Sequence, residues 1–191
     1  MADCFVHESA YVDEPVEIGA NTKIWFFCHV SKGARIGRNC SLGQNVYVGS
    51  RVVIGNNCKI QNNVSIYDLV TLEDNVFCGP SMVFTNDLNP RAAFPKGGQW
   101  VPTIVKQGAS LGANCTVICG YTIGSNAFVA AGSLVRMNVP EFAIVAGNPA
   151  KIIGWMCQCG GQLKFANGKS AVCPACALKY SKDGDKVEMA A

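Results

Sequence analysis

The sequence predicts an all-β protein whose main body is a parallel β-helix, and three observations support this prediction. Apolar residues recur every six positions, glycine is frequent in the position that follows them, and charged residues make up only 15% of the 191-residue chain. A period of six fits neither the 3.6 residues of a helical turn nor the two-residue alternation of a long strand. Short strands joined by tight turns do fit it, because each strand then points an apolar residue inward once per hexad.

The repeat runs in two series. The first has thirteen inward positions, of which twelve are aliphatic or phenylalanine, and the second resumes 21 residues later, so the phase shifts by three. Small or β-branched residues precede most inward positions by two, and we expect the glycines that follow to relieve steric strain at the corners. Unbroken registration over thirteen hexads argues against chance alternation in a β-sandwich. The series are Val12, Ile18, Ile24, Val30, Ile36, Leu42, Val48, Ile54, Ile60, Ile66, Leu72, Cys78 and Phe84, then Val105, Leu111, Val117, Ile123, Val129 and Val135.

Charge and composition argue against several function classes. The net charge is +3 and the basic residues are scattered, so we expect no nucleic-acid partner and no membrane partner. A small acidic ligand stays possible. The start of the chain lacks a basic segment followed by an apolar one, and no apolar stretch approaches the ~18 residues of a membrane span. We therefore expect a cytoplasmic protein with a main domain, residues 1–156, and a cysteine-rich tail, residues 157–191.

Eleven cysteines without an export signal indicate reduced thiols. Five lie inside the repeat, where a free thiol behaves as a small buried hydrophobe: Cys28, Cys40, Cys58, Cys78 and Cys115. Four follow the repeat as the pairs CxCG and CPAC, thirteen residues apart: Cys157, Cys159, Cys173 and Cys176. These pairs resemble the knuckles of a zinc ribbon, although the first has one intervening residue instead of two, and they predict a structural Zn²⁺ site. The alternative is a flexible tail with free thiols.

Three segments carry a resemblance to a known family. They are CKIQNNVSIYDLVTLEDNVFCGPSMVFTNDLNPRA, GASLGANCTVICGYTIGSNAFVAAGSLV and VAGNPAKIIGWMC. The chain resembles the hexapeptide-repeat acyltransferases, and among them the bacterial nucleotide-sugar N-acetyltransferases of the WlbB and WbpD type. The resemblance covers residues 5 to about 156. It implies a left-handed β-helix with three hexads per coil.

The resemblance also implies a function. Enzymes of this type use acetyl-CoA to acetylate the 3-amino group of UDP-2-acetamido-3-amino-2,3-dideoxyglucuronate, a precursor of a lipopolysaccharide O-antigen sugar. The expected assembly is a homotrimer with active sites between subunits. Two alternatives stay open: another hexapeptide-repeat O- or N-acetyltransferase, and a non-catalytic β-helical scaffold whose zinc ribbon recruits a protein or RNA partner. The loop and the GNPAK ending favour an enzyme, since a scaffold needs neither.

Residues 85–102 interrupt the repeat with three prolines and two glycines, so they leave the coil as a loop. A surface insertion without function is the alternative, but functional residues gather on loops that a rigid scaffold presents. The resemblance places this loop beside the acceptor sugar. Arg91 and Lys96 are then candidates for the pyrophosphate or the uronate carboxylate, and Arg91 is favoured because arginine can bind two oxygens at once. Asp87 is a further substrate-binding candidate.

Positions eighteen residues apart should stack at one corner of successive coils, because three hexads make a coil. Gly112, Ala130 and Asn148 have this spacing. A column of small residues lets a slender ligand approach the backbone, and the resemblance implies acetyl-CoA along the C-terminal coils with Lys151 near its phosphates. Turn geometry alone is the alternative and explains Gly112 equally well. Further candidates for the groove wall are Ala131 and Ala146.

The chain contains only His7 and His29, and neither lies in the loop or the C-terminal coils. His29 follows the aromatic run at residues 25–27, which indicates either subunit packing or a wall of the acceptor site. We therefore expect catalysis without a strong general base, on an amine that arrives partly unprotonated. Asn86 is the candidate that holds the amine through its carboxamide oxygen, with a backbone amide near Gly112 or Ala130 serving the oxyanion.

Overall fold

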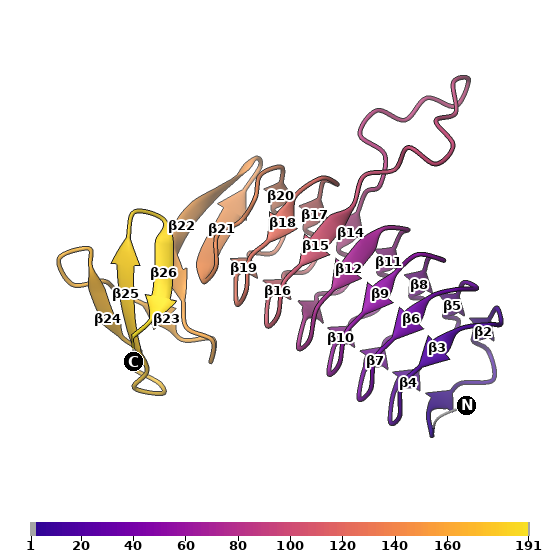
Figure 1. Cartoon of the computed structure of the whole chain (residues 1–191), viewed down its shortest axis with the longest axis horizontal. Helices are drawn as coiled ribbons and strands as arrows, with labels where there is room; N and C mark the ends of the chain where they lie inside the picture. Colours follow the sequence, from indigo (N-terminus) through magenta and orange to yellow (C-terminus); the bar gives the residue numbers. More distant parts are fainter. Residues whose placement is uncertain (1–2, 191) are drawn as a thin grey trace.

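Short parallel strands wind into a solenoid in the computed structural model, which describes residues 3–190 (Figure 1). Those residues form no helix, so they contain no helical segment that could cross a membrane. Phe5 pairs with Lys23 and Tyr11 with His29, so partners lie eighteen residues apart and each coil takes three hexads as predicted. Each coil contributes one strand to each of three sheets, which we call A, B and C.

Sheets B and C are parallel throughout. Sheet B contains β2 (Tyr11–Val12), β5 (His29–Val30), β8 (Tyr47–Val48), β11 (Ser65–Ile66), β14 (Val83–Phe84), β17 (Thr116–Val117) and β20 (Leu134–Val135). Sheet C contains β3 (Glu17–Ile18), β6 (Arg35–Ile36), β9 (Val53–Ile54), β12 (Val70–Leu72), β15 (Thr103–Val105) and β18 (Thr122–Ile123).

Sheet A is parallel until its last two strands, which run antiparallel and close the end of the solenoid. Its strands are β1 (Phe5–Val6), β4 (Lys23–Ile24), β7 (Ser41–Leu42), β10 (Lys59–Ile60), β13 (Phe77–Cys78), β16 (Ser110–Leu111), β19 (Phe128–Val129), β21 (Ala143–Gly147), β22 (Ala150–Met156) and β23 (Gln162–Leu163).

The core fills the inside of the coils with the residues of the six-residue series. Ile24, Leu42 and Ile60 are almost completely buried. The residues two positions earlier also point inward, and four of the five cysteines predicted for the repeat are buried there, while Cys78 is buried at a position of the series itself. Burial raises the pKa of the Cys78 thiol, and it raises that of Cys115 to about 12, so both stay protonated and pack as small apolar groups.

The corners use two residue types for two different reasons. Asn21, Asn39 and Asn57 adopt positive φ angles of 60°, 57° and 57°, and each carboxamide donates to the next at 3.2 Å. Asparagine tolerates this left-handed region, so it relieves the strain of the turn. Gly37 does not have a positive φ; a Cβ there would lie 2.5 Å from the carbonyl oxygen of Gly55 in the next coil. Glycine therefore relieves steric strain at this corner, and the strain that it avoids is a clash between stacked coils and not a positive φ.

Two departures from the eighteen-residue coil position the candidate site. Val70 pairs with Thr103, 33 residues later, so the loop adds fifteen residues between β14 and β15 without moving either strand out of its sheet. Val129 pairs with Val145, so the last coil is two residues shorter than the others. Figure 1 shows the loop projecting away from the solenoid.

The C-terminal residues 157–190, which we call the ribbon, lie at the end of the solenoid opposite the N terminus (Figure 1). They add β23 to sheet A and then form an antiparallel sheet, sheet D. Buried ribbon residues such as Leu163 and Tyr180 belong to the same apolar cluster as the coils, and the Tyr180 ring packs on Phe142 with 5.4 Å between centroids. Sheet D contains β24 (Ser170–Val172), β25 (Lys179–Asp183) and β26 (Lys186–Met189).

We predict that Gly37→Ala destabilises the protein by about 1–3 kcal/mol, because the added methyl group overpacks the contact between coils. The control is Gly97→Ala in the loop, where a Cβ meets nothing within 4 Å. Urea unfolding followed by circular dichroism measures both variants. Equal midpoints for Gly37→Ala and the wild-type protein would show that the coils do not depend on this close approach.

Candidate functional site

The loop is fastened to the solenoid at its neck. The carbonyl oxygen of Asn86 accepts the amide of Val101 at 2.9 Å, which closes the loop on itself. The ring of Trp100 lies 5.2 Å from the guanidinium carbon of Arg51, which comes from a corner two coils nearer the N terminus. The loop therefore leans toward the N-terminal coils, and its free part begins after Asn86.

Inside the loop, the charged candidates differ in whether another residue of the loop already pairs with their charge. The carboxylate of Asp87 accepts the amide of Asn89 at 2.8 Å and lies 3.8 Å from the ammonium of Lys96. Arg91 is exposed, and among residues 3–190 its guanidinium donates only to the carbonyl of Pro90, at 3.3 Å. Arg91 thus keeps its charge for an incoming anion, whereas Asp87 offsets that of Lys96.

A hollow of about 440 Å³ lies along the same corner, between sheets B and C. Its walls come from residues 15–17, 33–35 and 50–53 of three successive coils. Arg35 and Arg51 supply positive charge to it, and Arg51 also pairs with Asp68 at 3.3 Å beneath Trp100. The sequence prediction missed both arginines. The sequence does mark Arg51 as unusual, because it occupies a corner position at which the hexads before and after it have asparagine, Asn45 and Asn57.

His29 lies on β5, exposed on the outer face of sheet B. Its ring sits between those of Tyr11 and Tyr47, with centroids 5.8 and 5.6 Å away, and its Nε2 is 2.9 Å from the carboxylate of Asp13. Strand β14, which leads into the loop, is three strands away, or about 14 Å at ~4.8 Å per strand. Within one chain His29 therefore does not reach Asn86. The eighteen-residue spacing of Tyr11, His29 and Tyr47 is a signal that the sequence prediction missed.

The aromatic run before His29 lies at the other edge of sheet B, between sheets A and B. Phe26 and Phe27 are exposed, whereas Trp25 is half-buried and donates from its ring nitrogen to the hydroxyl of Ser41 at 3.3 Å. The ring of His7 lies 3.9 Å from that of Phe26. Two exposed rings and a neighbouring histidine ring suit packing against another molecule.

The small-residue column also lies at the corner between sheets A and B. Gly112 stacks on Ala130 as predicted: their preceding residues pair, and a Cβ on Gly112 would lie 2.5 Å from the amide nitrogen of Ala131. The placement of Asn148 in this column is wrong, because the last coil is two residues short and brings Ala146 into register instead. Asn148 lies at the exposed tip of the β21–β22 hairpin, and Lys151 pairs with Ala146 across it.

The hydrogen bonds of the column narrow the choice of backbone amide near Gly112 or Ala130 that could serve the oxyanion. The amides of Gly112 and Ala130 both donate, at 2.8 Å, to carbonyl groups of the next coil and so have no hydrogen left for a ligand. Within residues 3–190, the amide of Ala131 donates to no backbone carbonyl, and Ala131 is exposed. Ala131 is therefore the better donor at this corner.

The loop and the column lie at opposite edges of sheet B. The loop follows strand β14 and so lies at the edge of sheet B next to sheet C. The column lies between the sheet A strands and the sheet B strands of the last coils, and so at the edge next to sheet A. A single chain thus does not bring Asn86 against Ala131. Both candidates can meet one ligand where a loop from one chain reaches the column of a neighbour.

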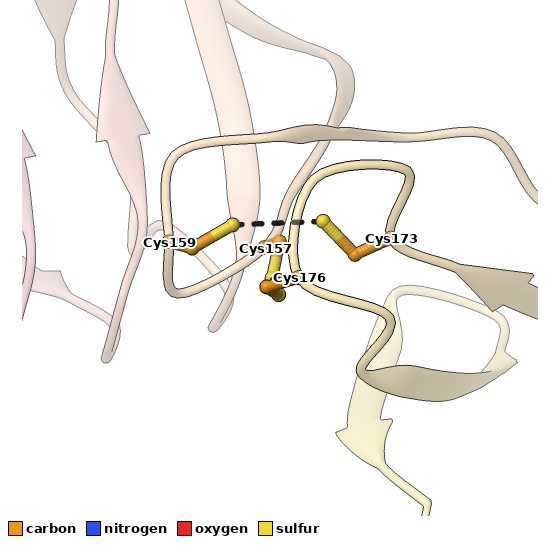
Figure 2. A group of neighbouring side chains, drawn as sticks. All are labelled: Cys157, Cys159, Cys173 and Cys176. Atoms are coloured by element: carbon orange, nitrogen blue, oxygen red, sulfur yellow. Dashed lines mark hydrogen bonds between the residues drawn. The ribbon is translucent and has the colours of Figure 1, made fainter.

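The four ribbon cysteines converge on one point (Figure 2). Their sulfur atoms all lie within 4.8 Å of one another, although the residues come from two separate turns. Burial alone would raise the pKa of Cys173, but the amides of Ala175 and Cys176 and the neighbouring thiols lower it to about 6. Burial and the Cys157 thiol raise the pKa of Tyr180 to about 12, so its hydroxyl keeps its proton beside this group. The cluster has the donor set of a metal centre.

Comparison with known proteins identifies the class. Residues 33–68 match the family model "Bacterial transferase hexapeptide (six repeats)", and residues 102–136 match "Hexapeptide repeat of succinyl-transferase". The fold is similar to that of a GDP-perosamine N-acetyltransferase from Caulobacter crescentus (TM-score 0.50, 21% identity, 80% of this chain and 57% of that chain). It is also similar to the polysialic-acid-specific acetyltransferase NeuO (TM-score 0.58, 19% identity, 78% and 81%). These likenesses define a left-handed β-helix of the hexapeptide-repeat class.

One relative narrows the class. The chain is 48% identical over 177 residues to the dTDP-3-amino-3,6-dideoxy-α-D-galactopyranose 3-N-acetyltransferase of Aneurinibacillus thermoaerophilus, covering 93% of this chain and 90% of that protein. A 2,3,4,5-tetrahydropyridine-2,6-dicarboxylate N-acetyltransferase of Staphylococcus aureus is 36% identical over a shorter segment, which covers 44% of this chain and 32% of that protein. The chain therefore belongs to the hexapeptide-repeat acyltransferases of the nucleotide-sugar N-acetyltransferase type. This favours the enzyme over the scaffold.

Proposed function

We propose that the protein transfers the acetyl group of acetyl-CoA to the 3-amino group of a nucleoside-diphosphate-linked 3-amino sugar. The 48% identity to a 3-N-acetyltransferase over nearly the whole chain carries this proposal. The half-buried column of Gly112, Ala130 and Ala146 supports it, because small side chains let the slender pantetheine arm of acetyl-CoA approach the backbone. Any metal held by the ribbon cysteines takes no part in the transfer, since four thiolates leave no position open for a substrate.

In the proposed step, the unprotonated amine attacks the carbonyl carbon of the thioester. A C–N bond forms and the C–S bond breaks, and the departing CoA sulfur takes the proton that the nitrogen loses, directly or through water. Asn86 holds the amine through its carboxamide oxygen, and the amide of Ala131 donates to the carbonyl oxygen as it gains charge. Neither group has to accept a proton, which fits a loop without histidine.

The acceptor is one of two related sugars. Resemblance to the WlbB and WbpD type favours UDP-2-acetamido-3-amino-2,3-dideoxyglucuronate and a role in lipopolysaccharide biosynthesis, whereas the 48% identical relative acts on a dTDP-linked 3-amino-3,6-dideoxy sugar. The glucuronate acceptor has a carboxylate that the 3,6-dideoxy sugar lacks. The exposed guanidinium of Arg91 suits such a carboxylate, because it can donate two hydrogen bonds to it. Arg35 and Arg51, on the hollow beside the loop neck, suit the pyrophosphate common to both.

We propose a homotrimer with the acceptor and acetyl-CoA bound between subunits. The loop and the column lie at opposite edges of sheet B, which supports this proposal, because the loop of one chain can meet the column of a neighbouring chain. The exposed rings of Phe26 and Phe27 supply apolar area for packing. We also propose a cytoplasmic location, since four metal-binding thiolates require reduced cysteines.

An assay of thiol release from acetyl-CoA with both amino sugars and their 3-hydroxy analogues tests the proposal. We expect turnover with at least one amine and none with the alcohols. If the uronate is the acceptor, Arg91→Ala should lower its kcat/KM about 10- to 100-fold, the loss of one charge-assisted hydrogen bond, while Arg38→Ala at another corner should not. No release with any 3-amino sugar would contradict the proposal.

We predict that Asn86→Ala lowers kcat about 10- to 100-fold, since a positioning hydrogen bond contributes roughly 1 to 3 kcal/mol. Asn89→Ala in the same loop is the matched control. A pH series of kcat compares Asn86→Ala with His29→Ala. If His29→Ala abolishes turnover and removes an acidic limb that Asn86→Ala keeps, His29 is the base and the assignment of Asn86 fails.

We predict that Lys151→Glu raises the KM for acetyl-CoA about tenfold with little change in kcat. Contacts to the CoA phosphates are made equally in the ground state and the transition state, so their loss weakens binding without slowing the chemical step. Initial-rate kinetics with Lys169→Glu, an exposed ribbon lysine, as control measure the effect. Unchanged acetyl-CoA saturation would exclude Lys151 from the site.

A further inference from the structure

The geometry of the four ribbon thiols suits a bound metal ion. Sulfur atoms of Cys157 and Cys176 are 3.4 Å apart, and those of Cys159 and Cys173 are 3.5 Å apart, as Figure 2 shows for the second pair. These separations are far longer than the ~2.05 Å of a disulfide bond. Four sulfurs around one Zn²⁺ ion at ~2.3 Å lie about 3.8 Å apart, close to the separations found here.

The two turns that present these thiols are built alike. The amide of Cys157 donates to the carbonyl of Gly161, and that of Cys173 donates to the carbonyl of Leu178, both at 2.8 Å. Each turn is thus closed by its own backbone hydrogen bond, which fixes the two thiols that the turn presents.

Gly161 gives an independent indication that the four sulfurs must come close together, because a side chain at this position would collide with them. A Cβ at this position would lie 2.9 Å from the sulfur of Cys173 and 3.5 Å from that of Cys159. Gly161 does not have a positive φ, so turn geometry does not require glycine here. The absence of a side chain lets the two turns close until all four sulfurs meet.

We propose that Cys157, Cys159, Cys173 and Cys176 bind one Zn²⁺ ion, and that this ion locks the ribbon over the end of the β-helix. The inference goes beyond the acetyl transfer and does not depend on it.

The ribbon depends on such an ion because its own core is small. Leu163, Ala171, Tyr180 and Val187 are its buried apolar residues besides the two buried cysteines, too few to hold about 34 residues unaided. The hydroxyl of Tyr180 is 3.0 Å from the Cys157 sulfur and accepts the amide of Gln158, while its ring packs on Phe142 of the last coil. This path couples the metal to the coils and covers backbone groups that an open end would expose.

Metal analysis of the purified full-length protein tests the proposal. We expect about one zinc ion per chain in the wild-type protein and in the control Cys4→Ser, and essentially none in Cys173→Ser. Replacement by Co²⁺ should give the visible absorption bands of a tetrahedral thiolate complex. Removing the metal with a chelator should speed tryptic cleavage after Lys164 and Lys169, whereas cleavage in the loop at Arg91 should not change.

A second variant keeps the test decisive if Cys173→Ser fails to fold. Gly161→Ala retains all four thiols, and its added methyl group should weaken zinc affinity about 10- to 100-fold in a chelator competition. The control Gly154→Ala, at a glycine without a positive φ where a Cβ would meet its nearest neighbours at 3.6 Å, should bind zinc as tightly as the wild-type protein. Four free thiols without metal, a mass showing disulfide bonds between these cysteines, or full zinc retention by Cys173→Ser would each overturn the proposal.

Discussion

Backbone hydrogen bonds between strands that pair mostly at a spacing of eighteen residues hold each coil on the next, and the other features of the molecule depend on this register. The contact between coils is close: Gly37 and Gly112 have backbone atoms of the next coil where a Cβ would be. Because the backbones of stacked coils are in close contact, a coil cannot gain or lose single residues without breaking this contact. The chain inserts a whole loop, as between β14 and β15, or it shortens a coil and stops, as after β20.

These two interruptions account for the proposed active site. The insertion places Asn86 and Arg91 at one edge of sheet B, held by Arg51 beneath Trp100. The shortened coil at the other end brings Ala146 under Ala130 and turns the chain into a hairpin. The two edges lie apart within a chain, so the proposed chemistry depends on the proposed trimer.

The same hairpin links the proposed cofactor wall to the ribbon. Strand β22 carries Lys151 near its start and leads directly into Cys157 at its end. A metal ion that fixes Cys157 therefore also fixes the end of the strand on which Lys151 lies. The packing of Tyr180 on Phe142 joins the ribbon to the core of the last coil, so coils and ribbon form one apolar cluster.

Sequence by itself determined the coil, the loop boundaries and the set of four cysteines, because a six-residue period, its interruption and paired cysteines are local patterns. Tertiary structure decided which residues share a corner at the end of the solenoid. Asn148 was placed in the column by counting eighteen, but Ala146 occupies it, because the shortened coil is a packing event without a sequence period. The roles of Ala131, Arg51 and Gly161 likewise depend on which hydrogen bonds are already made and which space is already filled. Those are properties of neighbouring coils and turns, and no residue carries them alone.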